Sequence, residues 1–284
     1  MYYYLIDPKR YDGRNFESLQ TRLLSLIGEY QVSGETARVT SIRRIEDLVA
    51  TALAHGCKTL VVVGGDQTLV EVIPLCKNKD ITIAFIPLDS QSEVARIIGV
   101  DDLDQAVSTV AKRRVVNMDL AKINDRLFIS SVNFGFLEKQ AQKPRAINLW
   151  ALGGSKPQIM EFDIDGNYRV KDAFFAGSII NSRDVSLCPT GYDKSIGSPM
   201  DGVLDLVLVS NTSRYDIWKN RKVLGGRCFE VLSGSTVIRA KKIKIEAPRE
   251  VELYISGLLV ASTPATIELV KEKLKMIVGR SRQF

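Results

Sequence analysis

The most chemically suggestive part of the chain is a pair of glycines between a strand-like run and a helix-like run. Residues 61–72 read VVVGGDQTLVEV, so three valines lead into Gly64 and Gly65 and a helical pattern follows. Such a turn exposes backbone N–H groups at a helix N-terminus, where a phosphate binds well. Many α/β proteins make the same turn without a ligand, so a purely structural turn is the alternative. The spacing is neither GxGxxG nor GxxxxGK[ST], which disfavours two common nucleotide folds.

The other reactive side chains argue against several chemistries. His55 is the single histidine, which disfavours a histidine-rich metal site and Ser-His-Asp catalysis. The four cysteines, at positions 57, 76, 188 and 228, are too far apart for a CxxC pair or a metal clip. We therefore predict that the cysteines fill core or near-surface positions, that no disulfide framework forms, and that the protein is cytoplasmic. No apolar run reaches 18 residues and no signal-peptide pattern opens the chain, so we expect no membrane span.

Composition sets broad limits on the fold and the partners. The chain has 284 residues, of which 45% are hydrophobic and 25% charged, as in ordinary globular proteins. This length predicts one large domain or two modest ones. A net charge of +6 favours an anionic partner. Because no recognition module is visible, we expect no nucleic acid among the partners.

Alternating strand and helix patterns in residues 1–113 predict the domain that positions the glycine turn. Residues 59–63 and 81–87 are short apolar runs typical of strands buried on both faces. The alternation predicts a Rossmann-like α/β domain with a parallel sheet. Pro74 should end or kink the helix that follows the turn.

Short strands separated by turn residues predict an all-β sandwich over residues 114–264. We expect hairpin turns at residues 125–126 and 165–167, and a strand over residues 236–246. Residues 143–158 contain two prolines and two glycines and are expected to form a surface loop. Residues 265–284 are expected to pack back on the first domain.

Four segments, in sequence order, resemble the motifs of the diacylglycerol kinase catalytic domain family, which includes bacterial lipid kinases and sphingosine kinases. Residues 64–72 resemble GGDGTxxEV, and residues 87–96, PLDSQSEVAR, resemble PLGTxNDFAR. Residues 199–205, PMDGVLD, resemble DDGxLDV, and residues 256–264, SGLLVASTP, resemble DGE…TP. The family's α/β nucleotide domain and β-sandwich agree with the patterns above. The related NAD kinases use an Asn-Glu pair, which does not occur in this sequence.

The resemblance implies transfer of the ATP γ-phosphate to a lipid hydroxyl, with Mg²⁺ as cofactor. The residues that it implies at the nucleotide are Thr40, Gly64, Gly65, Asp66, Gln67, Thr68 and Ser90. Asp66 is also the residue assigned to catalysis. Asp201, with backbone carbonyls near Ser198 and Val203, corresponds to a Mg²⁺ position, and oxygen ligands suit this cation. A plain turn residue before Gly202 is an equal alternative for Asp201.

Several positions depart from the family's pattern. Gln67 replaces the third glycine of GGDGT, and a left-handed backbone there would cost a β-carbon about 1–2 kcal/mol. Asp89 and Ser92 replace a glycine and an asparagine of the second motif. Residues 256–258 read SGL, so Leu258 stands where the family has its expected general base, a glutamate. Loss of a general base costs about 10²–10⁴ in rate, and we therefore expect kinase activity to be weak or lost.

Other functions stay open at this point. One is a non-catalytic pseudokinase or scaffold that binds nucleotide or lipid. Another is a kinase with a relocated base, for which Glu71 and Glu93 are the candidates.

A basic and aromatic cluster suggests a location at the membrane. Its members are Arg214, Tyr215, Trp218, Lys219, Arg221, Lys222 and Arg227. Such a cluster could bind an anionic membrane surface, which would suit a lipid substrate. A solvated helix face is the alternative. The sequence leaves the oligomeric state open, a homodimer included.

Overall fold

A computed structural model describes residues 1–11, 15–135, 156–186, 188, 195–210, 212–224 and 227–284. The chain divides into two compact units. The first unit comprises residues 1–118 and 272–283, and the second comprises residues 119–271. The boundaries expected at 113 and 264 therefore shift by five and seven residues. Residues 115–118 pair within the first unit, whereas residues 265–269 pair within the second.

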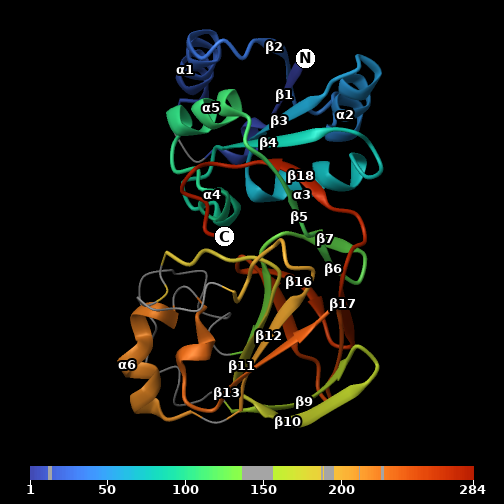
Figure 1. Ribbon diagram of the computed structural model, residues 1–284, viewed down its shortest axis with the longest axis vertical. Helices are drawn as coiled ribbons and strands as arrows, with labels where there is room; N and C mark the ends of the chain where they lie inside the picture. The colour runs from blue at the N-terminus through green and yellow to red at the C-terminus, as the bar shows by residue number, and fades with distance from the viewer. Residues whose placement is uncertain (12–14, 136–155, 187, 189–194, 211, 225–226) are drawn as a thin grey trace. The chain divides into compact units, whose positions relative to one another are not determined.

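The first unit is a six-stranded sheet with the strand order β2-β1-β3-β4-β18-β5. Its strands are β1 (Tyr2–Ile6), β2 (Gly34–Arg38), β3 (Thr59–Gly64), β4 (Thr82–Pro87), β5 (Val115–Met118) and β18 (Leu274–Ile277). Its helices are α1 (Phe16–Glu29), α2 (Ile45–Ala54), α3 (Asp66–Leu75), α4 (Glu93–Ile98) and α5 (Leu103–Lys112), and a 3-10 turn, η1 (Pro8–Arg10), follows β1. All strands are parallel except β5, which runs antiparallel to β18. Figure 1 shows β18 between β4 and β5, although it comes from the far end of the chain.

The apolar runs explain the placing of the central strands. Every residue of β3 is buried, which requires cover on both faces of the sheet. In register, Ile6 lies opposite Arg38 and Val63, and Gly64 lies opposite Pro87. The carboxyl ends of β1 to β4 therefore meet at one edge. The predicted parallel α/β domain is confirmed, and the edge carries the glycine turn.

The second unit consists of two six-stranded antiparallel sheets, with the orders β10-β9-β14-β17-β6-β7 and β13-β12-β11-β8-β15-β16. The strands of one sheet are β6 (Ala121–Ile123), β7 (Arg126–Phe128), β9 (Gln158–Ile164), β10 (Tyr168–Phe174), β14 (Lys242–Glu246) and β17 (Ala265–Leu269). Those of the other are β8 (Ser131–Gly135), β11 (Ala176–Ile180), β12 (Leu204–Val209), β13 (Ser235–Ala240), β15 (Glu252–Ile255) and β16 (Leu258–Ser262). A shared core with Phe134, Phe162 and Leu206 joins the sheets, which confirms the sandwich.

The predictions for the turns, for the strand over 236–246 and for the loop have different outcomes. The hairpin at Asp165 and Gly166 is confirmed, because both residues have the positive φ that a tight turn requires. The other turn lies at Asn124 and Asp125, one residue earlier than predicted. The strand expected over 236–246 is two strands in different sheets, β13 and β14. Most of the loop expected at 143–158 lies outside the described residues, and Gln158 already begins β9.

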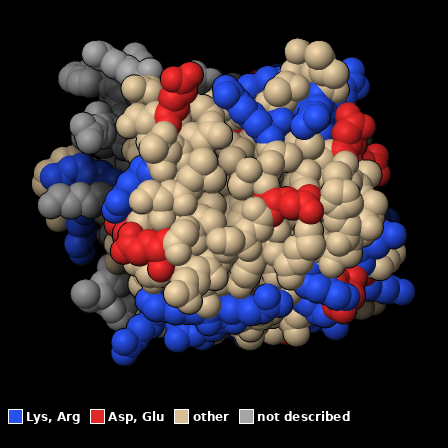
Figure 2. All heavy atoms as spheres, turned by 90° about the horizontal axis from the view of Figure 1, so that it is seen from above, with Lys and Arg blue, Asp and Glu red and all other residues tan. Residues whose placement is uncertain are grey.

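A helix and a 3-10 turn lie against the second sheet of this unit. They are α6 (Arg214–Leu224) and η4 (Phe229–Val231), which share a small core with Ile217, Leu224 and Phe229. Within the described residues, no helix is both long and apolar enough to cross a membrane. On the face drawn in Figure 2, Lys and Arg side chains gather along the borders around a largely uncharged centre.

Candidate functional site

The glycine turn at the carboxyl edge of the first sheet is built as an open helix N-terminus. β3 ends at Gly64, Gly65 is the N-cap, and α3 begins at Asp66. Gly65 has no side chain that could cap the helix, so the first N–H groups of α3 are left for solvent or a ligand. An anion at this position would also meet the positive end of the helix dipole.

Close packing explains why position 64 is glycine. A β-carbon on Gly64 would lie only 2.8 Å from the Thr68 hydroxyl oxygen, too close for any real contact. Gln67 is different, because it lies within the first turn of α3 and is not among the described residues with positive φ. The strain expected for a β-carbon at position 67 is therefore absent, and the helix accepts glutamine. Helix α3 ends at Leu75, directly after Pro74, as predicted.

Asp7 is a member of this site that sequence reasoning missed. It follows β1, is 5% exposed, and accepts a hydrogen bond of 2.7 Å from the Thr68 hydroxyl. Its own N–H donates to the carbonyl of Val63, which fixes the end of β1 against β3. Because the single hydroxyl proton of Thr68 is used by Asp7, Thr68 positions the turn and keeps only lone pairs for other partners.

Asp66 ties the glycine turn to the next helix. Its carboxylate accepts a hydrogen bond from the Ser92 hydroxyl and another, at 2.9 Å, from the N–H of Glu93. Ser92 in turn caps α4 by accepting from the N–H of Ala95. Burial raises the pKa of Asp66 to about 6, although these hydrogen bonds oppose the shift. The carboxylate is thus engaged in joining α3 to α4.

The segment after β4 closes the edge beside the turn. The N–H of Leu88 donates to the carbonyl of Gly64 at 2.8 Å. Asp89 accepts a hydrogen bond from the N–H of Gln91, which makes the local turn that leads into α4. Ser90 lies exposed on this turn. The side chain of Asp89 therefore stabilises this turn.

Thr40 lies beyond the end of β2, on the far side of β1 from the glycine turn. Its hydroxyl oxygen accepts hydrogen bonds from the N–H groups of Ile42 and Arg43. The structure thus brings Gly64–Thr68 and the segment around Ser90 together, and it places Thr40 two strands away along the same edge.

The second unit holds the loop that resembles a cation site. Asp201 is exposed and accepts a hydrogen bond of 3.2 Å from the N–H of Val203. Gly202 has a φ of 74°, and its N–H donates to the buried Asp119. Within the described residues, Asp201 does not belong to any group of three close metal-binding side chains. A cation here would rest on one carboxylate together with carbonyl oxygens and water.

Leu258 stands at a hairpin corner in the same unit. Ser256 and Gly257, with φ of 48° and 78°, form a two-residue turn between β15 and β16. Leu258 opens β16 and is 48% exposed, and the next residue, Leu259, is 54% exposed. The position of the expected general base therefore carries an exposed hydrocarbon side chain.

The cysteine prediction is wrong for one pair. Cys188 and Cys228 form a disulfide across 40 residues of sequence, because the chain after β11 comes to lie beside η4. Sequence spacing contains no information about this proximity. Cys57 and Cys76 are free and buried, as expected.

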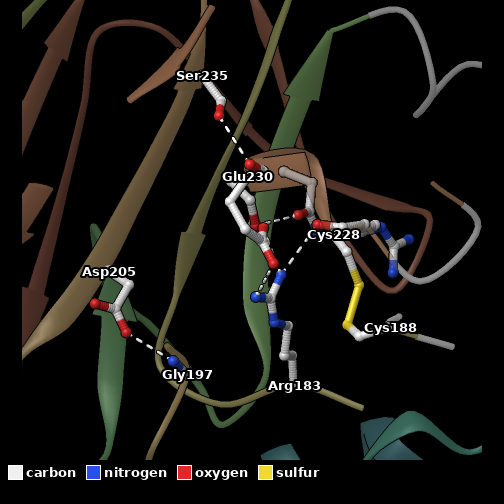
Figure 3. Close-up of polar contacts among 10 residues, drawn as sticks. Arg183, Cys188, Gly197, Asp205, Cys228, Glu230 and Ser235 are labelled. Atoms are coloured by element: carbon white, nitrogen blue, oxygen red, sulfur yellow. Dashed lines mark hydrogen bonds and ion pairs between the residues drawn. A yellow bond between two sulfur atoms is a disulfide. The ribbon is translucent and has the colours of Figure 1, made fainter. Parts of the chain in front are cut away.

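A buried ion pair accompanies the disulfide (Figure 3). Arg183, 3% exposed, forms two hydrogen bonds, of 2.6 and 3.2 Å, with the carboxylate of Glu230. The Glu230 carboxylate and both sulfur atoms lie within 4.8 Å of one another, as metal ligands would. Because the sulfurs are bonded to each other and Glu230 is held by Arg183, the cluster serves as a structural clamp.

Comparison with known proteins finds a family model and individual kinases to which this chain is similar. Residues 4–123 match the diacylglycerol kinase catalytic domain family. A diacylglycerol kinase of Mycobacterium tuberculosis is 23% identical over 256 residues, which cover 82% of this chain and 81% of that protein. A YegS-like lipid kinase of Pseudomonas aeruginosa is 33% identical over 94 residues, only 31% of its length.

Solved structures agree in fold. A diacylglycerol kinase of Bacillus anthracis has a TM-score of 0.74 at 19% identity, over 99% of this chain and 97% of that one. An NAD kinase of Archaeoglobus fulgidus, solved in complex with ATP, has a TM-score of 0.52 at 14% identity, over 99% and 95% of the chains. These structures show that the chain shares their fold, and its residues 4–123 match the model of the diacylglycerol kinase catalytic domain family.

Proposed function

We propose that this chain is a lipid-kinase-like protein in which transfer of the ATP γ-phosphate to a lipid hydroxyl is weak or lost. One observation carries the proposal: Leu258 occupies the position that the family resemblance assigns to the general base. A leucine side chain can neither accept a proton nor bind a cation. Because phosphoryl transfer also depends on positioning and metal, some turnover can persist without the base.

Nucleotide would bind at the glycine turn under this proposal. The uncapped N-terminus of α3 supplies N–H donors, and Gly65, the N-cap without a side chain, lets a ligand approach the backbone. Mg²⁺ would neutralise phosphate charge, and Asp201 with the carbonyls of Ser198 and Val203 would hold a structural cation. Asp66 would influence the site by fixing α3 against α4.

The test is a direct assay of phosphoryl transfer. Purified protein is mixed with ATP, Mg²⁺ and dioctanoylglycerol in detergent micelles, and phosphorylated lipid is measured. We expect rates at least a hundredfold below the range of roughly 1–100 s⁻¹ that is usual for kinases. Turnover within that range would contradict the proposal.

A non-catalytic nucleotide-binding role is the second candidate, and the intact glycine turn favours it. It predicts that ATP or ADP raises the melting temperature without turnover, because a ligand that binds only the folded state stabilises it. Equal melting temperatures with and without nucleotide would remove this candidate.

We also propose that α6 brings the protein to anionic membrane surfaces, as a peripheral association. Tyr215 and Trp218 are 69% and 47% exposed, one helical turn apart, and the guanidinium of Arg221 lies 4.8 Å from the Trp218 ring centre. The acid of this helix, Asp216, is held by the N–H and hydroxyl of Ser233. Exposed aromatic rings beside cations suit the headgroup region of a bilayer.

A further inference from the structure

A cavity in the first unit lies apart from the glycine turn and has a basic lining. It measures about 310 Å³ and lies between α5, the segment before β5 and the segment after β18. We call it the α5 cavity. Its charged lining residues are Lys112, Arg114 and Arg280, and no acidic residue lines it. A cavity with three cations and no acid is complementary to a multiply charged anion.

The acidic side chains at the start of α5 already have other partners. Asp104 accepts a hydrogen bond from the Tyr30 hydroxyl and lies 3.6 Å from Arg22. Asp102 caps α5 by accepting from the N–H of Gln105. Within the part of the chain that the structure describes, Lys112, Arg114 and Arg280 form no ion pair. The three charges are thus available to a ligand.

One face of α5 supplies the polar wall. Gln105, Thr109 and Lys112 follow each other at spacings of four and three residues and therefore share a side of the helix. A cation in the last turn of a helix also complements the helix dipole. This effect alone would explain a lysine at position 112. The dipole does not explain why Arg114 and Arg280, from two other segments, line the same cavity.

Close backbone contacts fix the opposite wall. A β-carbon on Gly279 would collide with the carbonyl oxygen of Gly99, so only glycine lets the chain after β18 pack against the end of α4. The N–H of Gly279 donates to the carbonyl of Ile98, and that of Val278 donates to the carbonyl of Arg114, at 2.8 and 2.9 Å. The backbones that carry Arg114 and Arg280 are therefore held together.

The α5 cavity is separate from the glycine turn. The turn follows β3, whereas the cavity borders β18 and β5, two and three strands further along the sheet. At a strand spacing of about 4.8 Å, this is a lateral distance of roughly 10–14 Å. One phosphate group cannot occupy both places.

We propose that the α5 cavity binds a phosphate monoester. Arginine side chains pair with phosphate oxygens through two parallel hydrogen bonds, and a lysine adds a third positive charge. The volume is at the lower limit for small-molecule sites, which suits a phosphorylated headgroup or a free phosphorylated metabolite. This inference does not depend on nucleotide binding or on turnover.

Titration calorimetry at constant ionic strength tests the site with three probes: inorganic phosphate, sn-glycerol 3-phosphate and dioctanoyl phosphatidate. The test variant is Lys112→Gln with Arg114→Gln and Arg280→Gln. The control is Lys241→Gln with Lys244→Gln and Arg249→Gln, which removes the same charge from exposed positions of the second unit. We expect saturable binding that is roughly ten- to a hundredfold weaker in the test variant and unchanged in the control.

The three probes also identify the source of the phosphate. Tightest binding of dioctanoyl phosphatidate supports a lipid headgroup, and equal or tighter binding of glycerol phosphate supports a free metabolite. Absence of saturable binding for all three probes overturns the proposal, as does equal affinity in the test variant. Circular dichroism of both triple variants checks that each remains folded.

Discussion

The Ser92 hydroxyl donates a hydrogen bond to the carboxylate of Asp66, and this contact joins the helix after the glycine turn to the helix after the next strand. Ser92 also caps α4, so one side chain fixes both helix starts. The turn and its neighbour therefore form a single rigid corner, in which the ionisation of Asp66 has a measurable effect on folding.

Stability should increase as Asp66 gains a proton. Burial raises its folded-state pKa to about 6, above the value of 3.8 for the free group. The stabilisation from protonation is fully present below pH 3.8 and is lost as the pH rises through about 6. We expect the wild type to lose about 2–3 kcal/mol, relative to Asp66→Asn, between pH 4 and pH 7. Urea unfolding of both proteins across this range measures the difference, and parallel pH profiles would contradict it.

The packing of Gly64 against Thr68 predicts a non-additive pair of substitutions. Gly64→Ala places a β-carbon 2.8 Å from the Thr68 hydroxyl oxygen, and overpacking of this kind costs about 1–3 kcal/mol. Thr68→Ala removes the clashing oxygen. Gly64→Ala should therefore lower the free energy of unfolding less in the Thr68→Ala protein than in the wild type. Denaturant unfolding of the four proteins gives the coupling energy. A coupling energy of zero would show that the two residues do not meet.

Restoring the carboxylate at the hairpin corner tests the loss of the general base. Ser256→Asp with Leu258→Glu should raise γ-phosphate transfer to dioctanoylglycerol by roughly 10²–10⁴ if the rest of the site is intact. Aspartate tolerates the left-handed backbone of position 256 better than most residues do. Leu259→Glu, on the other face of the same strand, is the matched control and should leave the rate unchanged. Unchanged turnover in the double variant would show that more than the base has been lost.

The disulfide should contribute strongly to the stability of the second unit. A bond that closes about 40 residues is expected to contribute about 4 kcal/mol through the unfolded state. Cys188→Ser should therefore lower the urea midpoint, and dithiothreitol should lower it for the wild type but not for Cys188→Ser. Cys57→Ser, at a free cysteine, should leave the sensitivity to dithiothreitol intact. A wild type that dithiothreitol does not affect would argue against the bond.

Exposed aromatic rings on α6 predict a vesicle-binding phenotype. Tyr215→Ala with Trp218→Ala should reduce co-sedimentation with phosphatidylglycerol vesicles about tenfold or more, because both rings are exposed beside Arg221. Tyr168→Ala removes an equally exposed ring from β10 and is the control. Equal loss in the control, or binding that the double variant retains, would remove α6 from the membrane contact.

Much of the fold could be predicted from local patterns, because the apolar runs of β3 and β4 and the glycines between strand and helix determine structure within a few residues. The hairpin at Asp165 and Gly166 was predictable for the same reason. The division of residues 236–246 between two sheets was not, since both halves are strand-like and only their partners differ.

The site residues that escaped prediction depend on long-range contacts. Asp7 meets Thr68 across 61 residues, and Cys188 meets Cys228 across 40. An acidic residue directly after a buried strand was the one available signal for Asp7, because the carboxyl ends of parallel strands gather at one edge. At Gln67 the error has the opposite cause: the family motif suggested backbone strain, whereas the local backbone is ordinary helix.

The position of β18 has a consequence for how the protein is made. The strand that covers the edge of β4 and carries β5 leaves the ribosome only after the whole sandwich has been synthesised. Until then the nascent first unit exposes an unpaired, strongly apolar strand, which other chains could join. Completion of the first sheet therefore requires synthesis through β18, and translation interrupted before this strand would release an aggregation-prone fragment.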